Sequence, residues 1–188
     1  MQKLHEKIER SLLKILIAVC SLILLVALGG YFSVKTFRDW QVRRLLADAN
    51  ALVNERNYND ATMDARRVLE LDSGNADAMR VIARSAESAG LRNAMEFWRR
   101  ATELSGNAEQ DVISWAQCAI RFGDAMSATK ALDQMPEHGK DTVSYHALRG
   151  DVELMRRDLA GYETELLEAK RINPQDRKID LALATLHL

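Results

Sequence analysis

Few residues in this chain have the types and spacing that catalysis or metal binding requires. None of the 4 histidines stands at His-x-x-x-His spacing or forms a Cys/His ligand set. Cys118 lies between Gln117 and Ala119, as expected of a small buried residue rather than a nucleophile. Apart from Gly29-Gly30 the glycines are isolated, so no phosphate-binding loop is present. The sequence therefore predicts no catalytic residue, metal site, cofactor or small-molecule substrate, and hence a protein that is not an enzyme.

Charge and composition narrow the class of protein further. The 188 residues include 26 Lys and Arg against 27 Asp and Glu, a net charge of −1. Without excess positive charge to displace phosphate counterions, nucleic acid is not an expected partner. The length suits one domain with an appendage, and the hydrophobic share of 47% is concentrated in residues 15–34.

Residues 15–34 form an apolar run without a single charged residue. A helix rises about 1.5 Å per residue, so this run spans about 30 Å, the thickness of a membrane's hydrocarbon core. It is predicted to be a transmembrane helix, because only a helix satisfies its own backbone there. A cleaved signal peptide, cut near Ala27-Leu28-Gly29, is the alternative, although the apolar run continues to Val34.

The orientation of this helix follows from its flanks. Four Lys or Arg lie on each side, so the count of positive charges is tied. The tail of residues 1–14 carries four cations and is hard to translocate, which favours the cytoplasm for the N-terminus. We therefore expect a single-pass membrane protein, in a bacterium an inner-membrane protein with its larger part in the periplasm.

Beyond residue 41 the sequence repeats itself every 33 or 34 residues. One series of small residues is Ala49, Ala83, Ala116 and Gly150. A second series, usually 12 residues later, is Ala61, Ala94, Ala128 and Tyr162. Apolar residues at helical spacing surround both series, and no stretch alternates with a period of two. Each repeat is therefore predicted to be a pair of helices, in an all-α chain.

At these positions the chain resembles the tetratricopeptide repeat family, whose unit is a helix–turn–helix of about 34 residues. The resemblance covers residues 42–176 and implies an α-solenoid. The fourth repeat follows the family at Pro174, although Tyr162 replaces the usual Ala. The second repeat lacks one residue near Gly90, and the early Pro136 should shorten the second helix of the third repeat.

The predicted organisation has five parts. They are a basic tail (1–14), a transmembrane helix (15–34), a short helical connector (35–41), four repeats (42–75, 76–108, 109–142 and 143–176) and a last helix (177–188). That last helix is apolar on more than one face, whereas a terminal solenoid helix should expose a polar face. We expect it to be the first helix of a further repeat, or a capping helix covered by another protein.

The resemblance also implies a concave groove, lined by the first helix of each repeat, that holds extended protein segments. The family's groove positions correspond to Asn50, Asn54, Arg80, Arg84, Gln117, Arg121 and Asp151. Arg80, Arg84 and Arg121 would lie on adjacent helices, where their donors could converge on a carboxylate. The amides of Asn50, Asn54 and Gln117 suit hydrogen bonds to an extended backbone. The alternative is that the arginines pair with Asp77 and Glu87.

These features predict a membrane-tethered scaffold or adaptor. Its partner would be a protein, bound through an extended or acidic segment, in a role such as the assembly or folding of envelope proteins. Two alternatives stay open. The chain could be the anchor and regulatory arm of a longer enzyme that continues past Leu188. It could also be a structural subunit of a membrane complex, packed through small residues such as Gly29 and Gly30.

Overall fold

The computed structural model describes residues 35–186. The tail and the predicted transmembrane helix, residues 1–34, lie outside this range. All regular secondary structure in the described range is helical, which confirms the all-α prediction for this part of the chain. Within the same range, no helix combines the length and the apolar character needed to cross a membrane. Residues 35–44 and 45–186 fall into two compact units, which are described separately.

Residues 35–44 are helical and expose two aromatic rings. Phe37 is 63% exposed and Trp40 48%, and their ring centroids lie 5.9 Å apart. The guanidinium carbon of Arg44 lies 5.6 Å from the centroid of Trp40, within the range of a cation–π interaction. This short segment therefore combines exposed aromatic surface with basic side chains.

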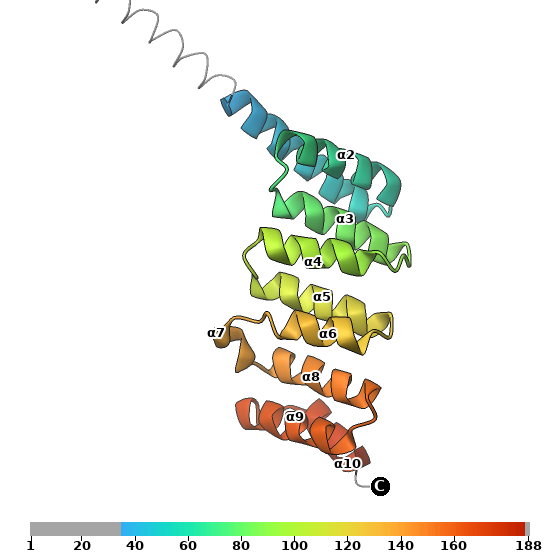
Figure 1. Ribbon diagram of the computed structural model, residues 1–188, viewed down its shortest axis with the longest axis vertical. Helices are drawn as coiled ribbons and strands as arrows, with labels where there is room; N and C mark the ends of the chain where they lie inside the picture. The colour runs from blue at the N-terminus through green and yellow to red at the C-terminus, as the bar shows by residue number, and fades with distance from the viewer. Residues whose placement is uncertain (1–34, 187–188) are drawn as a thin grey trace, which may run out of the picture. The chain divides into compact units, whose positions relative to one another are not determined.

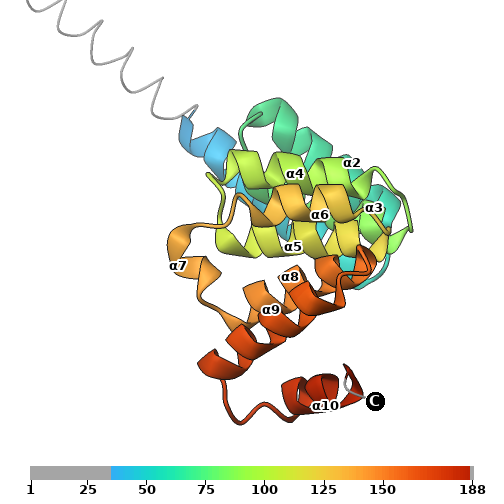
Figure 2. The ribbon, with the colours of Figure 1, turned by 60° about the horizontal axis from the view of Figure 1, so that its bottom comes forward.

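The second unit is a succession of helices in which neighbours along the chain pack together. Residues 45–54 are helical. The helices after them are α2 (Tyr58–Leu71), α3 (Ala76–Ser88), α4 (Ala94–Leu104), α5 (Glu109–Arg121), α6 (Ala125–Leu132), α7 (Glu137–Lys140), α8 (Val143–Met155), α9 (Leu159–Ile172) and α10 (Arg177–Leu186). Figures 1 and 2 show α2 to α9 following one another in chain order. Such local packing is the property that defines a solenoid.

The recurring small residues form the centre of the core. They are Ala49, Ala61, Ala83, Ala94, Ala116 and Ala128, all of them 0% exposed. Without large side chains at these positions, the paired helices approach closely. Larger side chains such as Trp98, Trp115 and Leu132 fill the surrounding space and are themselves buried. The spacing of small residues in the sequence therefore corresponds to the contacts between helices.

The third repeat is shortened, as the position of Pro136 led us to expect. Its second helix, α6, has 8 residues, whereas α2 and α9 have 14 each. The short helix α7 begins directly after Pro136 and leads into α8. Both α5 and α6 pack against α8, so the succession of helices continues across this interruption.

The turn between the two helices of a repeat has the same construction each time. It contains a residue with positive φ, which is Arg56, Gly90, Gly123 or Arg157. The next residue donates its amide to the carbonyl five residues back, as in a Schellman motif. In three of the four turns of the described chain that residue also caps the following helix through its side chain, namely Asn57, Asp124 and Asp158. The exception is Leu91, which has no side-chain oxygen.

Candidate functional site

Side chains from three successive first helices surround a half-open hollow of about 290 Å³, which we call the groove pocket. It is lined by Val53, Arg84, Glu87, Ser88, Trp98, Ser114, Gln117 and Arg121. Three of the candidate residues, Arg84, Gln117 and Arg121, therefore lie together. Trp98, Ser88 and Ser114 were not among the candidates. Trp98 comes from a second helix, where its sequence position indicates only a large side chain of the core.

Glu87 organises the floor of the groove pocket. The indole nitrogen of Trp98 donates to Oε2 of Glu87 over 2.9 Å. Nη1 of Arg121 lies 3.2 Å from Oε1 of the same carboxylate. Both oxygens of Glu87 are therefore engaged, and its negative charge is partly compensated from α5.

Arg84 is held differently. Its Nη2 donates to Oδ1 of Asn50 over 2.8 Å, and the amide nitrogen of Asn50 donates to the carbonyl of Leu46 over 2.8 Å. Within residues 35–186 no carboxylate pairs with Arg84. The neutral amide fixes the position of the guanidinium without compensating its charge, so Arg84 remains able to bind a carboxylate from another molecule.

Arg80 belongs to a different structure. Its Nε and Nη2 donate to the two oxygens of Asp111, each over 2.7 Å, and its Nη1 donates to Asp77 over 2.5 Å. The side chain of Asp111 is 1% exposed, and its hydrogen bond raises the pKa of the Arg80 guanidinium above the ordinary value. The guanidinium of Arg80 is therefore held by Asp111 and Asp77, and Arg80 does not line the groove pocket with Arg84 and Arg121. Arg80 and Arg121 pair with acidic residues of the chain itself.

The remaining candidates lie apart from the groove pocket. Asn54 is exposed at the end of its helix, and Asp151 lies on α8. Burial raises the pKa of the Asp151 carboxyl. Asn50 reaches the pocket only through its hydrogen bond to Arg84. The structure thus brings together Asn50, Arg84, Gln117 and Arg121, and leaves out Arg80, Asn54 and Asp151.

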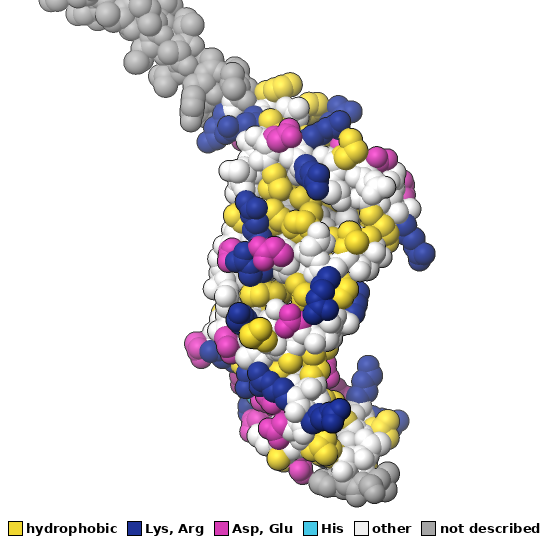
Figure 3. Space-filling model, turned by 45° about the vertical axis from the view of Figure 1, so that its right-hand side comes forward, with side chains coloured by type: hydrophobic (Ala, Val, Ile, Leu, Met, Phe, Trp, Pro, Cys, Tyr) yellow, Lys and Arg dark blue, Asp and Glu magenta, His cyan; other side chains and the backbone are white. Residues whose placement is uncertain are grey.

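The outer surface carries both signs of charge. In Figure 3, Lys and Arg side chains alternate with Asp and Glu over the visible face. Among the described residues, several ion pairs lie within one helix, such as Arg67 with Asp64 at 2.9 Å and Arg99 with Glu96 at 2.5 Å. Pairs of this kind at exposed positions contribute little to stability. They do balance the charge of the second helices.

Residues 35–186 contain no cluster of His, Cys, Asp or Glu that could hold a metal ion. His146 lies against Glu165, with Nδ1 and Oε2 2.8 Å apart, and thereby links α8 to α9. Cys118 is 0% exposed, and burial raises the pKa of its thiol to about 12. A thiol that stays protonated at neutral pH is a poor nucleophile.

Cys118 is therefore expected to resist alkylation in the folded protein. In a Cys20→Ala variant Cys118 is the single thiol, so labelling by a maleimide reports on it alone. At neutral pH we expect complete labelling in denaturant and almost none without denaturant over the same time. Equally fast labelling under both conditions would contradict the buried position of Cys118.

No protein-family model and no curated protein matches this chain. Solved structures do. The structure described as a functional characterization of Pseudomonas aeruginosa PilF is 17% identical, with a TM-score of 0.64 over 79% of this chain and 68% of that one. MamA from Desulfovibrio magneticus RS-1, from residue 41 to its end, is 10% identical, with a TM-score of 0.68 over 78% of this chain and 83% of that one.

A tetratricopeptide repeat protein from Parabacteroides merdae is 14% identical, with a TM-score of 0.66 over 78% of this chain and 57% of that one. The described chain has a tetratricopeptide repeat fold. At these identities the likeness establishes the fold alone.

Proposed function

We propose that this protein is a membrane-tethered protein–protein interaction scaffold whose groove pocket binds an extended protein segment with a carboxylate. The observation that carries the proposal is Arg84, a guanidinium that pairs with no acidic residue in the described chain and lines a hollow between first helices. The repeat fold supports the proposal, because solenoids present extended concave surfaces for binding.

The side chains of the groove pocket suit such a segment. Arg84 is already oriented by Asn50, so fewer rotamers have to be fixed when a carboxylate binds. Gln117 can both donate and accept hydrogen bonds, which matches the alternating groups of an extended backbone. The hydroxyl of Ser114 donates to the carbonyl of Gln110, and its oxygen can accept from a bound segment. Arg121 is 64% exposed and pairs with Glu87, so the uncompensated positive charge of the groove pocket is that of Arg84. The preferred segment is therefore extended and acidic.

Tethering is proposed from the chain that precedes the repeats. Residues 15–34 are apolar over the thickness of a bilayer. Just after them, Phe37 and Trp40 expose aromatic rings and Arg44 lies over Trp40, a combination that suits the membrane–water interface. With the basic tail in the cytoplasm, the repeats would lie in a bacterial periplasm. There the scaffold would serve the assembly or folding of envelope proteins.

The test begins with a photo-crosslinking amino acid at position 117 of the full chain in native membranes. The same amino acid at Lys130, an exposed residue of α6, is the matched control. A protein captured from position 117 but not from 130 is then purified and its affinity is measured. Arg84→Glu is expected to weaken its binding at least about tenfold, since a charge-assisted hydrogen bond is replaced by repulsion.

Arg84→Lys should keep part of the affinity, because it retains the charge but not the planar donor fork. Lys130→Glu, which makes the same charge reversal elsewhere, should leave binding unchanged. If a partner captured at position 117 binds Arg84→Glu as tightly as it binds the natural chain, the groove pocket is not its binding site.

A further inference from the structure

The second repeat is one residue shorter than the others, and the loss falls in the turn before α4. The amide of Leu91 donates to the carbonyl of Ala86 over 2.9 Å, as the amide of Asp124 does to Ala119. Leu91 therefore occupies the position of a helix cap without an oxygen that could cap. As a result α4 begins only at Ala94, after a tight turn in which the amide of Ala94 donates to the carbonyl of Leu91 over 3.0 Å.

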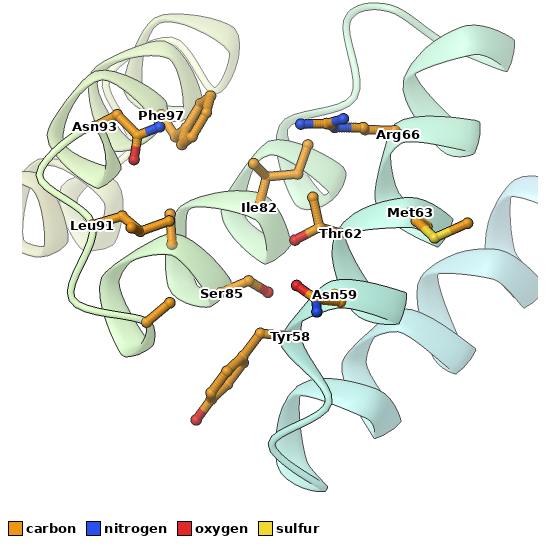
Figure 4. Close-up of a pocket in the computed structure, with 12 residues that line it drawn as sticks. Tyr58, Asn59, Thr62, Met63, Arg66, Ile82, Ser85, Leu91, Asn93 and Phe97 are labelled. Atoms are coloured by element: carbon orange, nitrogen blue, oxygen red, sulfur yellow. The ribbon is translucent and has the colours of Figure 1, made fainter.

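Beside this turn lies a cavity of about 430 Å³, which we call the gap cavity. Figure 4 shows it between α2, α3 and the start of α4. Tyr58 and Thr62 of α2 form one wall, Leu91 and Phe97 form another, and Ile82 lies between them. A cavity of this size and mainly apolar character is in the range of binding sites.

Ser85, in the floor of the gap cavity, is a polar residue at a buried position. It is 2% exposed, and its hydroxyl has no hydrogen-bond partner in the described chain. The third and fourth repeats hold Cys118 and Val152 at the corresponding position, and both are fully buried. In Figure 4 the hydroxyl points toward Asn59 of α2. An unpaired buried hydroxyl is unfavourable, so its presence here indicates a use for the polar atom.

The rim of the gap cavity has the residue types that are typical of a protein–protein interface. Among its described lining residues, Arg66 alone is charged, and no acidic residue of the described chain pairs with it. Its guanidinium points across the cavity in Figure 4. Met63 and Leu91, which also line the cavity, are 53% and 52% exposed and add apolar surface to its rim. Aromatic residues, Met and Arg are the types enriched in protein interfaces.

We propose that the gap cavity is a second protein-binding site, which takes a large apolar side chain, best a Trp, from a segment with acidic neighbours. The ring would fill the space that the missing turn leaves, and its N–H would donate to the hydroxyl of Ser85. A neighbouring carboxylate would pair with Arg66. The acidic preference follows from charge, because the lining offers one unpaired cation and no anion.

This site is distinct from the groove pocket. Helix α3 contributes Ile82, Ser85 and Ala86 to the gap cavity, and Arg84, Glu87 and Ser88 to the groove pocket. Since successive residues of a helix are turned by about 100°, the two sets lie on different faces of α3. Two partners could therefore be bound at once, which is what an adaptor requires.

The probe is a set of fluorescent synthetic peptides, each with a Trp flanked by Glu residues, added to the full chain in lipid nanodiscs. One matched peptide replaces Trp with Ala, and another replaces Glu with Lys. Fluorescence anisotropy, with empty nanodiscs subtracted, measures binding. We expect the peptide with Trp and Glu to bind at least about tenfold more tightly than either matched peptide.

Ser85→Val gives the decisive variant, because the fourth repeat already uses Val at this position. It removes the unpaired hydroxyl and narrows the gap cavity, so it should raise Tm by a few degrees and weaken peptide binding at least about tenfold. Loss of binding in a more stable protein is not explained by unfolding. Lys130→Glu, which reverses a charge outside both sites, should leave the affinity for the peptide unchanged.

A second variant inserts Asp after Gly90, which restores the length of the other repeats and supplies a capping oxygen. It should close the gap cavity and abolish peptide binding. Equal affinity for the peptides with Glu and Lys, or unchanged binding by both variants, would overturn the proposal. It would also be overturned if the cavity bound the dye anilinonaphthalene sulfonate but none of the peptides. The same holds if the full chain formed dimers that Ser85→Val abolished, because the occupant would then be a second copy of the chain.

Discussion

Replacing Arg80 with Met is expected to lower the free energy of unfolding by about 3 to 5 kcal/mol. The reason is the carboxylate that it leaves behind. Asp111 is 1% exposed, and Arg80 supplies two hydrogen bonds of 2.7 Å to it from the preceding repeat. Without Arg80 a buried charge loses its partner, which costs far more than the loss of an exposed ion pair. The second contact of Arg80, with the exposed Asp77, adds little to this effect.

Chemical denaturation of Arg80→Met measures the loss, and Arg84→Met is the matched control four residues later on the same helix. Arg84 is exposed and bonded only to an amide, so its replacement should change stability by about 0.5 kcal/mol or less. Adding Asp111→Leu to Arg80→Met should recover most of the loss, because an apolar pair can replace a buried ion pair. Equal stabilities of Arg80→Met and Arg84→Met would instead return Arg80 to the candidates for partner binding.

The arrangement of the helices could be predicted because it depends on a property that the sequence displays directly. Small residues such as Ala83 and Ala94 recur at fixed intervals, and close helix packing requires them at those positions. The length of α6 was likewise indicated by Pro136, since proline limits the preceding helix. Backbone constraints of this kind act locally and are visible without coordinates.

The roles of the three arginines could be predicted only in part. Pairing with Asp77 and Glu87 was the alternative that the sequence offered, and Arg80 and Arg121 make these two pairs. The pairing of Arg80 with Asp111 was not expected. Arg80, Arg84 and Arg121 all occupy positions that face a groove in the resembled family. Their separate roles depend on which acidic residue each side chain reaches, and Asp111 stands 31 residues from Arg80. In the sequence, Asp111 resembles any acidic residue in the first turn of a helix. Only the geometry shows that it is buried and already paired.

The gap cavity could be predicted in part. The missing residue near Gly90 was visible from the spacing of the repeats, but its consequence was not. A shorter repeat can lose a residue from a helix end, a turn or a cap. Here the hydrogen bond from the amide of Leu91 to the carbonyl of Ala86 is retained, and the first turn of α4 is missing. The missing turn leaves the space beside Ser85.

The effect of Gly150→Ala on stability is expected to change sign with the residue at position 162. In the first three repeats an Ala of the first helix corresponds to an Ala of the second, whereas the fourth has Gly150 and Tyr162. A Cβ added to Gly150 would lie 3.1 Å from Cδ2 and 3.3 Å from Cε2 of the Tyr162 ring. Gly150 is buried within α8, so neither helix can move away freely.

In the natural chain Gly150→Ala should therefore cost up to about 2 kcal/mol. Overpacking costs about 1 to 3 kcal/mol and is partly offset by the better helix propensity of Ala, worth about 1 kcal/mol. In a Tyr162→Ala background the ring is gone, and the same substitution should stabilise by about 1 kcal/mol. Denaturation of the four proteins in this cycle gives both values, with an expected coupling of about 1 to 3 kcal/mol.

Ala116→Gly in the third repeat is the matched control, because its counterpart Ala128 is small and the site already holds a Cβ. There the change should be destabilising by about 1 kcal/mol, through propensity and a small cavity. If Gly150→Ala has the same sign with Tyr and with Ala at position 162, the ring of Tyr162 is not the reason for glycine in α8. If the sign changes, the glycine is explained by packing. The fourth repeat then makes room for the Tyr162 ring on its second helix by having no side chain at position 150 of its first helix.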